Sequence, residues 1–255
     1  MEQYRKAFAR LLAETGALFF DKGLVLKDGR PTPYFVNMGG FRTGKLNYEL
    51  GGFFAELLVR SGLLEHTDVI LGPSYKGSAI ACATTNALWL NHRKELLFEY
   101  DRKEAKTHGE ASASKSLFVN GCFTVNRNIV IVDDVGTSMA TKYELVEKIE
   151  NEAALKGVEL RIRAVVLGID REQTTAVYDQ AGNVLLGVRG SDAADEFASK
   201  TGIEVHRICG IRDIVEYLFK ERIPVTVAGR MQALDDPLKQ EFDRYLDVYG
   251  TRSVR

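Results

Sequence analysis

The stretch "NIVIVDDVGTSMATKYE", residues 128–144, decides the fold because it joins a buried strand to a helix through a polar turn. Four consecutive apolar β-formers, 129–132, lead directly into Asp133 and Asp134. An apolar run without alternation is typical of a strand covered on both faces, as in a parallel sheet with crossover helices. Similar runs alternate with helical stretches elsewhere: 68–73, 94–100 and 162–170. The sequence therefore predicts an α/β fold with a central, mostly parallel sheet flanked by helices.

The outer parts of the chain carry weaker signals. Residues 1–20 have apolar side chains near helical spacing, which predicts an amphipathic surface helix. Residues 177–188 form two β-prone segments around Gly182 and Asn183, which predicts a hairpin. The remaining predicted elements are a helix at 192–202, a strand at 203–210 and a helix at 211–222. After Pro224 one last helix is predicted at 236–250, with Pro237 near its first turn.

Composition narrows the class of protein and of partner. The chain has 255 residues, of which 45% are hydrophobic and 27% charged, and this is ordinary for a water-soluble globular protein. Its net charge of -1 gives no overall attraction to polyanions, so we expect no nucleic-acid partner. No apolar run approaches the ~20 residues needed to cross a bilayer, and no signal-peptide pattern starts the chain. The scattered cysteines, Cys82, Cys122 and Cys209, favour a reducing, cytoplasmic location.

Asp133 and Asp134 lie at the carboxyl end of the predicted strand, where ligands bind in open α/β sheets. Neighbouring strand residues point to opposite faces, so this pair is poorly placed to chelate one metal together but can accept hydrogen bonds from the hydroxyls of a ribose. The next loop offers the hydroxyls of Thr137, Ser138 and Thr141 and backbone N–H groups at a helix N-terminus, which suit a phosphate. The pattern indicates a sugar-phosphate site. The alternative is that Asp134 and Thr137 only cap the helix.

The segment "IVIVDDVGTSMAT", residues 129–141, resembles the phosphoribosyl-pyrophosphate (PRPP) binding signature of the type I phosphoribosyltransferase family. The resemblance implies that the two acids hold the ribose hydroxyls and that the following loop holds the 5′-phosphate. Met139 stands where the family usually has Gly, which permits a positive φ and a close approach of backbone to ligand.

The implied architecture is the type I phosphoribosyltransferase fold with a small N-terminal hood region. We expect one such domain over residues 1–222, with hood elements from about 1–40 and a hairpin insertion near 176–190. A C-terminal helical extension would follow at 223–255.

Further segments resemble the orotate phosphoribosyltransferase family within this fold, and they occur in the family's order. "LKDGRPTPYFVN" (26–37) resembles its N-terminal signature, although Asp28 and Thr32 stand where the family usually has Ser. "GPSYKG" (72–77) resembles the family's pyrophosphate loop, and "DRKEAKTHGE" (101–110) resembles its mobile catalytic loop. "GIDREQ" (168–173) resembles the strand end that supplies an arginine to orotate. In the family the pyrophosphate loop carries an unusual peptide geometry just before its aromatic residue.

The resemblance implies roles for individual residues. The residues implied in PRPP binding are Tyr75, Lys76, Asp133, Asp134, Val135, Gly136, Thr137, Ser138, Met139, Ala140 and Thr141. Those implied in orotate binding are Lys27, Phe35, Val36, Thr137 and Arg171. Those implied in catalysis are Arg102, Lys103, Lys106 and His108. Taken alone, Arg171 can equally form an ion pair with Asp170 or Glu172, and Phe35 can equally pack in the core.

The activity implied is transfer of the 5-phosphoribosyl group from PRPP to orotate, giving orotidine 5′-monophosphate and pyrophosphate. Mg²⁺ would be held mainly by PRPP and water, as this ion prefers, so no protein metal site is expected. The family further implies a homodimer whose active sites are shared across the interface. Two other readings stay open: a type I phosphoribosyltransferase for a purine or another base, and a PRPP-binding regulatory paralogue.

Overall fold

A parallel sheet forms the centre of the computed structural model, which describes residues 1–102 and 116–252. Its five strands are ordered β4-β3-β5-β6-β7. All of its strand pairs are parallel, as the sequence predicts. The strands are β3 (Val69–Gly72), β4 (Leu97–Tyr100), β5 (Arg127–Gly136), β6 (Leu160–Asp170) and β7 (Glu204–Gly210).

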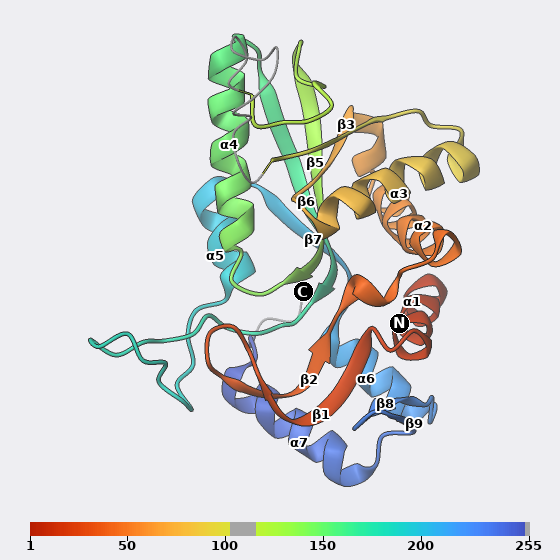
Figure 1. Cartoon of the computed structure of the whole chain (residues 1–255), viewed down its shortest axis with the longest axis vertical. Coiled ribbons are helices and arrows are strands. Elements are labelled where there is room, and N and C mark those ends of the chain that lie inside the picture. Colours follow the sequence, from red (N-terminus) through yellow and green to blue (C-terminus); the bar gives the residue numbers. More distant parts are fainter. Residues whose placement is uncertain (103–115, 253–255) are drawn as a thin grey trace.

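Helices cover both faces of this sheet, which explains the unbroken apolar runs of its strands (Figure 1). Val130 and Val132 of β5 belong to the core shared with the first helices, whereas Ile129 and Ile131 belong to the core under α4 and α5. The period of two along a strand thus feeds two separate cores. The helices are α1 (Gln3–Glu14), α2 (Gly44–Arg60), α3 (Lys76–His92), α4 (Ala140–Lys156), α5 (Ala193–Thr201) and α6 (Ile211–Lys220), with short 3₁₀ turns η1 (Met38–Gly40) and η2 (Leu63–His66).

A second, four-stranded sheet joins the two ends of the chain in the order β2-β1-β8-β9. Its strands are β1 (Leu18–Val25), β2 (Pro31–Val36), β8 (Val225–Val227) and β9 (Arg230–Gln232). The predicted N-terminal helix is therefore confirmed only as far as Glu14, because residues 18–20 begin β1. The two strands after Pro224 were not predicted, so this part of the chain is not purely helical.

The last helix, α7 (Asp236–Tyr249), packs against this smaller sheet (Figure 1). The Asp235 carboxylate caps it by accepting a hydrogen bond from the Leu238 N–H at 2.9 Å. Its aromatic side chains Phe242 and Tyr245 contact the ring of Tyr34 on β2, with centroids 5.4 and 6.0 Å apart. The C-terminal segment is thus built into the hood that the N-terminal strands form.

The predicted hairpin within 177–188 is confirmed as a turn but not as a pair of regular strands. One bridge joins Tyr178 and Val184, and the Asp179 carboxylate accepts hydrogen bonds from the N–H groups of Ala181 and Asn183. Gly182 takes a positive φ of 82° at the turn. The segment extends away from the body of the molecule (Figure 1). Within the described ranges, no helix is both long and apolar enough to cross a membrane.

Candidate active site

Four of the predicted segments meet at the carboxyl edge of the central sheet. Lys76, at the start of α3, places its Nζ 3.2 Å from Oδ2 of Asp134 on β5 and 3.4 Å from Oδ1 of Asn37, which follows β2. Gly136 at the end of β5 pairs with Asp170 at the end of β6, directly before Arg171. The turns after β3, β5 and β6 and the end of β2 therefore surround one region, as expected for a ligand site in an open α/β sheet.

The two acids point to opposite faces of β5, and each has a lysine of its own. β5 continues to Gly136, so both acids lie within the strand and not after it. Oδ2 of Asp133 accepts a short hydrogen bond from the buried Lys142 ammonium of α4, and its Oδ1 accepts one from the Asp134 N–H at 2.9 Å. Asp134 instead faces Lys76, whose side chain is half exposed. Asp133 thus pairs with a buried lysine, whereas Asp134, whose Oδ1 accepts the Val135 N–H at 2.8 Å, pairs through its Oδ2 with a lysine at the surface.

Lys142 was not among the predicted site residues. It is only 4% exposed, and its ammonium also donates to the Val135 carbonyl oxygen at 3.3 Å. Its position in the first turn of α4 did not indicate a role in the site, because a lysine there usually points to solvent.

Burial and the neighbouring Asp133 charge raise the pKa of Asp134, and Lys76 acts against that rise.

The turn between β5 and α4 keeps the conformation that the sequence signature requires. Met139 has a φ of 58° and is the N-terminal cap residue of α4, so this position is left-handed although it is not Gly. Its side chain is 2% exposed and packs in the core with Leu145 and Ile149. No side chain caps the helix, so the alternative of a simple cap by Asp134 or Thr137 is wrong. Ser138, Ala140 and Thr141 are exposed, and Thr137 is half-buried.

The loop after β3 is held closely against the start of α3. A Cβ at Gly72 would lie 1.8 Å from the Gly77 carbonyl oxygen, so only glycine fits there. The peptide bond between Ser74 and Tyr75 is cis, at the position where the family's unusual peptide geometry was expected. Tyr75 and Lys76 are exposed at the tip of the loop.

Asp101 links this loop to the base of the predicted catalytic loop. Its Oδ1 accepts the Ser74 N–H at 2.8 Å, and its Oδ2 pairs with Lys148 of α4 at 2.5 Å. Arg102, the next residue, donates its N–H to the Leu117 carbonyl at 2.6 Å. The buried Glu99 carboxylate accepts the backbone N–H groups of residues 100, 119, 120 and 122 and fixes the returning chain. Lys103, Lys106 and His108 lie outside the described residues.

Arg171 lies buried beneath the hood, with 4% of its surface exposed. Its guanidinium carbon is 4.7 Å from the centre of the Tyr34 ring, and its Nη2 is 3.4 Å from the Thr32 hydroxyl. Asp170 and Glu172, the acids on either side of it in the sequence, both pair with another arginine, at position 207.

The remaining residues predicted for orotate binding belong to the hood. Lys27 is exposed in the turn between β1 and β2, whereas Val36 is buried in the core. Phe35 is half-buried and packs against Phe19 at 5.8 Å between ring centroids. No contact between Lys27 or Phe35 and Arg171 is found in the part of the chain that the structure describes.

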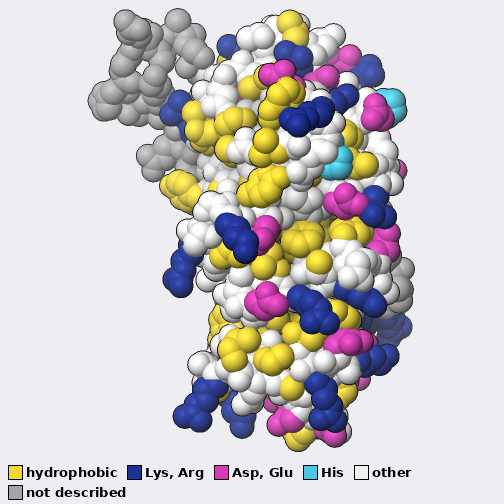
Figure 2. All heavy atoms as spheres, turned by 90° about the vertical axis from the view of Figure 1, so that its right-hand side faces the viewer, with side chains coloured by type: hydrophobic (Ala, Val, Ile, Leu, Met, Phe, Trp, Pro, Cys, Tyr) yellow, Lys and Arg dark blue, Asp and Glu magenta, His cyan; other side chains and the backbone are white. Residues whose placement is uncertain are grey.

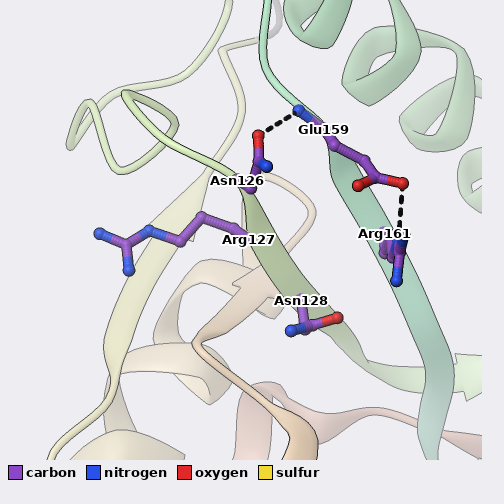
Figure 3. Close-up of a pocket in the computed structure, with 5 residues that line it drawn as sticks. All are labelled: Asn126, Arg127, Asn128, Glu159 and Arg161. Carbon is purple, nitrogen blue, oxygen red and sulfur yellow. Dashed lines mark hydrogen bonds and ion pairs between the residues drawn. The ribbon is translucent and has the colours of Figure 1, made fainter.

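A pocket of about 240 Å³ lies at the other end of the central sheet, where β5 and β6 begin (Figure 3). Its polar groups interact with one another: Glu159 forms an ion pair with Arg161 at 2.7 Å, and Asn126 accepts a hydrogen bond from the Glu159 N–H at 2.8 Å. It is lined by Asn126, Arg127, Asn128, Glu159 and Arg161. Since ligands of such sheets bind at the carboxyl ends of strands, we place the site at the Asp134 edge.

Comparisons with known proteins agree on one family. The chain is 33% identical over 218 residues to the orotate phosphoribosyltransferase of Saccharophagus degradans, covering 86% of this chain and 90% of the relative. It is 31% identical over 258 residues to that of Chromohalobacter salexigens, covering 99% and 97%. The solved orotate phosphoribosyltransferase of Francisella tularensis superimposes with a TM-score of 0.71 at 26% identity, covering 96% of this chain and all of that one. No protein-family model matches the chain.

We predict that Lys142→Met destabilises the fold by about 3–5 kcal/mol, because it leaves the Asp133 carboxylate buried without its cation. Adding Asp133→Asn should restore most of that loss, since the site is then neutral. Urea unfolding of the single and double variants measures both effects. A double variant no more stable than Lys142→Met would contradict the pairing.

We predict that Met139→Gly lowers stability by about 1–3 kcal/mol. Relief of the left-handed conformation returns roughly 1 kcal/mol, but losing a buried methionine side chain costs more. Met139→Leu, which conserves volume, should cost less than about 1.5 kcal/mol. Thermal unfolding compares the two, and a Gly variant more stable than the natural protein would show that the side chain adds nothing to the core.

Proposed function

The chain belongs to the orotate phosphoribosyltransferase family, and we propose on that premise that it transfers the 5-phosphoribosyl group from PRPP to orotate in pyrimidine (UMP) biosynthesis. The products are orotidine 5′-monophosphate and pyrophosphate. The observation that carries the proposal is that three groups meet at one sheet edge. They are the Asp134 carboxylate, the exposed ammonium of Lys76 that pairs with it, and the buried guanidinium of Arg171. These groups match the ribose hydroxyls, the pyrophosphate and the carboxylate of the two substrates.

PRPP would bind along the end of β5 and the turn that follows it. Asp134 accepts hydrogen bonds from the ribose hydroxyls, while Asp133 fixes the strand end through Lys142. The backbone N–H groups and hydroxyls of residues 135–141 receive the 5′-phosphate at the N-terminus of α4, where the helix dipole favours an anion. Tyr75 and Lys76 lie beside the pyrophosphate.

Orotate would lie between the hood and Arg171. A planar guanidinium suits a carboxylate because it can donate two parallel hydrogen bonds. Lys27 brings a second charge from the β1–β2 turn, and the backbone at Phe35 and Val36 borders the ring. Since Phe35 itself packs on Phe19, its side chain helps to hold β2 against β1.

In the reaction, the bond from C1 of the ribose to pyrophosphate breaks and a ring nitrogen of orotate forms the new bond to C1. The electron pair of the broken bond leaves with pyrophosphate, so negative charge grows on that group. Lys76, together with Arg102, Lys103 and Lys106 of the catalytic loop, would stabilise this charge, and His108 would assist with proton or phosphate contacts.

We also propose that the enzyme uses Mg²⁺ held mainly by the substrate. Both oxygens of Asp133 are already engaged and Asp134 has Lys76 beside it, so the protein has little to offer as direct ligands. This fits an ion that keeps water and substrate phosphates in its coordination sphere. When bound, the ion would neutralise charge on the pyrophosphate.

A homodimer is proposed as the working unit. Trp89 and Leu90 at the end of α3 and Leu97 on the edge strand β4 are exposed, which supplies apolar surface for a second copy. Hydrophobic side chains are spread over the face that carries the first helices (Figure 2). The proposed location is cytoplasmic, where the free thiols of Cys82, Cys122 and Cys209 would stay reduced.

The direct test incubates the protein with PRPP, Mg²⁺ and orotate, and follows loss of orotate absorbance together with pyrophosphate release. We expect turnover of orotate, none with adenine, guanine or hypoxanthine, and none after EDTA removes the metal. Turnover of a purine base but not of orotate would move the chain to another branch of the fold, and binding of PRPP with no turnover of any base would indicate a regulator.

We predict that Lys76→Ala lowers kcat on the order of 10²-fold, because it removes a cation from the departing pyrophosphate. Since Lys76 also lowers the pKa of Asp134, its loss should move the acid limb of the pH profile for PRPP binding to higher pH. Lys45→Ala, on the exposed face of α2, is the matched control and should leave both unchanged. Equal rates for Lys76→Ala and Lys45→Ala would remove Lys76 from the mechanism.

A further inference from the structure

The surroundings of Arg171 contain carboxylates, yet no ion pair between Arg171 and a carboxylate is found among the described residues. Asp170 and Glu172 are its neighbours in sequence, and Asp28 faces it from the β1–β2 turn closely enough to feel its charge. Burial opposes ionisation of Asp28, but hydrogen bonds from Arg30 outweigh it and lower the pKa of that carboxyl, so Asp28 carries a full negative charge. Each of these three acids would be an ordinary partner for a buried arginine.

Arg207 of β7 forms ion pairs with Asp170 and Glu172, the two acids next to Arg171 in the sequence. Its Nη1 lies 2.9 Å from Oδ2 of Asp170, and its Nη2 lies 3.4 Å from Oε1 of Glu172. Glu172 also accepts the Arg212 N–H at 2.8 Å, while Oδ1 of Asp170 accepts the Glu172 N–H at 2.8 Å. Both carboxylates are therefore held by groups of β7 and of the helix that follows it, α6.

Arg30 forms an ion pair with Asp28, the third acid. Its Nη2 lies 2.7 Å from Oδ2 of Asp28, and the Arg30 side chain is 1% exposed. The guanidinium is fixed from two further sides, because Nη1 donates to the Thr174 carbonyl at 2.8 Å and the Tyr249 ring lies 5.4 Å away. Tyr249 belongs to α7, so the C-terminal segment holds this pair in place.

Among the described residues, the groups found in contact with Arg171 are neutral: the Thr32 hydroxyl and the side chains of Tyr34 and Tyr245. In the described part of the chain, Nε of Arg171 and the hydroxyls of both tyrosines are buried without a hydrogen-bond partner. Burying a charge without a counter-ion is costly, and unsatisfied buried donors are rare in folded proteins. Such an arrangement is expected where a ligand brings the missing negative charge.

We propose that Arg207 and Arg30 are positioning residues that hold three carboxylates off Arg171, so that its charge is reserved for the carboxylate of orotate. The proposal rests on the function proposed above and adds a reason for selectivity. Uracil, which lacks the carboxylate, cannot neutralise Arg171. The hood residues Tyr34 and Tyr245 fix the guanidinium without competing for its charge.

The test substitutes Arg207→Gln, which frees Asp170 and Glu172 to pair with Arg171. We expect KM for orotate to rise at least roughly 30-fold, the lower end of the range for loss of a buried charge pair. KM for PRPP should stay within about twofold, since the phosphate side of the site is unchanged. Arg207→Lys should restore most of the orotate affinity because it keeps the charge. Arg161→Gln, at the opposite end of the sheet, is the matched control.

A second variant separates the proposed role from simple loss of folding. Arg207→Gln combined with Asp170→Asn and Glu172→Gln has no freed carboxylate, and we expect KM for orotate to return to within about threefold of the natural value. Equal rises of KM for both substrates, or no recovery in the combined variant, would overturn the proposal. A natural protein that binds PRPP but never consumes orotate would instead overturn the proposed function, so the two failures are distinguishable.

Discussion

The ion pair between Asp133 and Lys142 is the contact on which the site depends. Two adjacent carboxylates at the end of a buried strand repel each other, and burial adds to the cost of keeping both ionised. The strand geometry sends them to opposite faces, where Asp133 meets the buried Lys142 and Asp134 meets the exposed Lys76. Asp133 is thereby fixed within the fold, and Asp134 is paired with the exposed side chain of Lys76. The end of β5 becomes rigid while its ligand-facing carboxylate stays available.

The two sides of the site handle charge in different ways. On the proposed phosphate side the cation Lys76 is exposed, and a hydrated lysine would suit the mobile charge of PRPP. On the proposed base side the guanidinium of Arg171 is buried, and the nearby acids pair with Arg207 and Arg30. The hood contributes to this arrangement of charges, because its sheet joins both ends of the chain. Helix α7 of the hood places Tyr245 beside Arg171 and the Tyr249 ring against Arg30. The C-terminal segment thus serves the site as well as the fold.

Local patterns were sufficient for most of the central domain. Unbroken apolar runs marked the strands of the parallel sheet, and the polar turn after Asp134 marked the start of α4. The short strands β8 and β9 left no such pattern, because β8 is stabilised by pairing with β1, about 200 residues earlier, and β9 by pairing with β8. Residues with a role set by a distant partner were missed for the same reason. Arg207 and Lys142 look like ordinary strand and helix residues until the fold brings Asp170 and Asp133 to them.

The central claim is that the acid at the end of β5 and the turn after it grip an activated sugar phosphate. Isothermal titration of the protein with PRPP at millimolar Mg²⁺, run beside Asp134→Asn, tests it most directly. We expect the natural protein to release binding heat that saturates at one PRPP per chain, and the variant to bind at least about tenfold more weakly. Absence of any binding heat in the natural protein, or equal affinity in the variant, would contradict the claim.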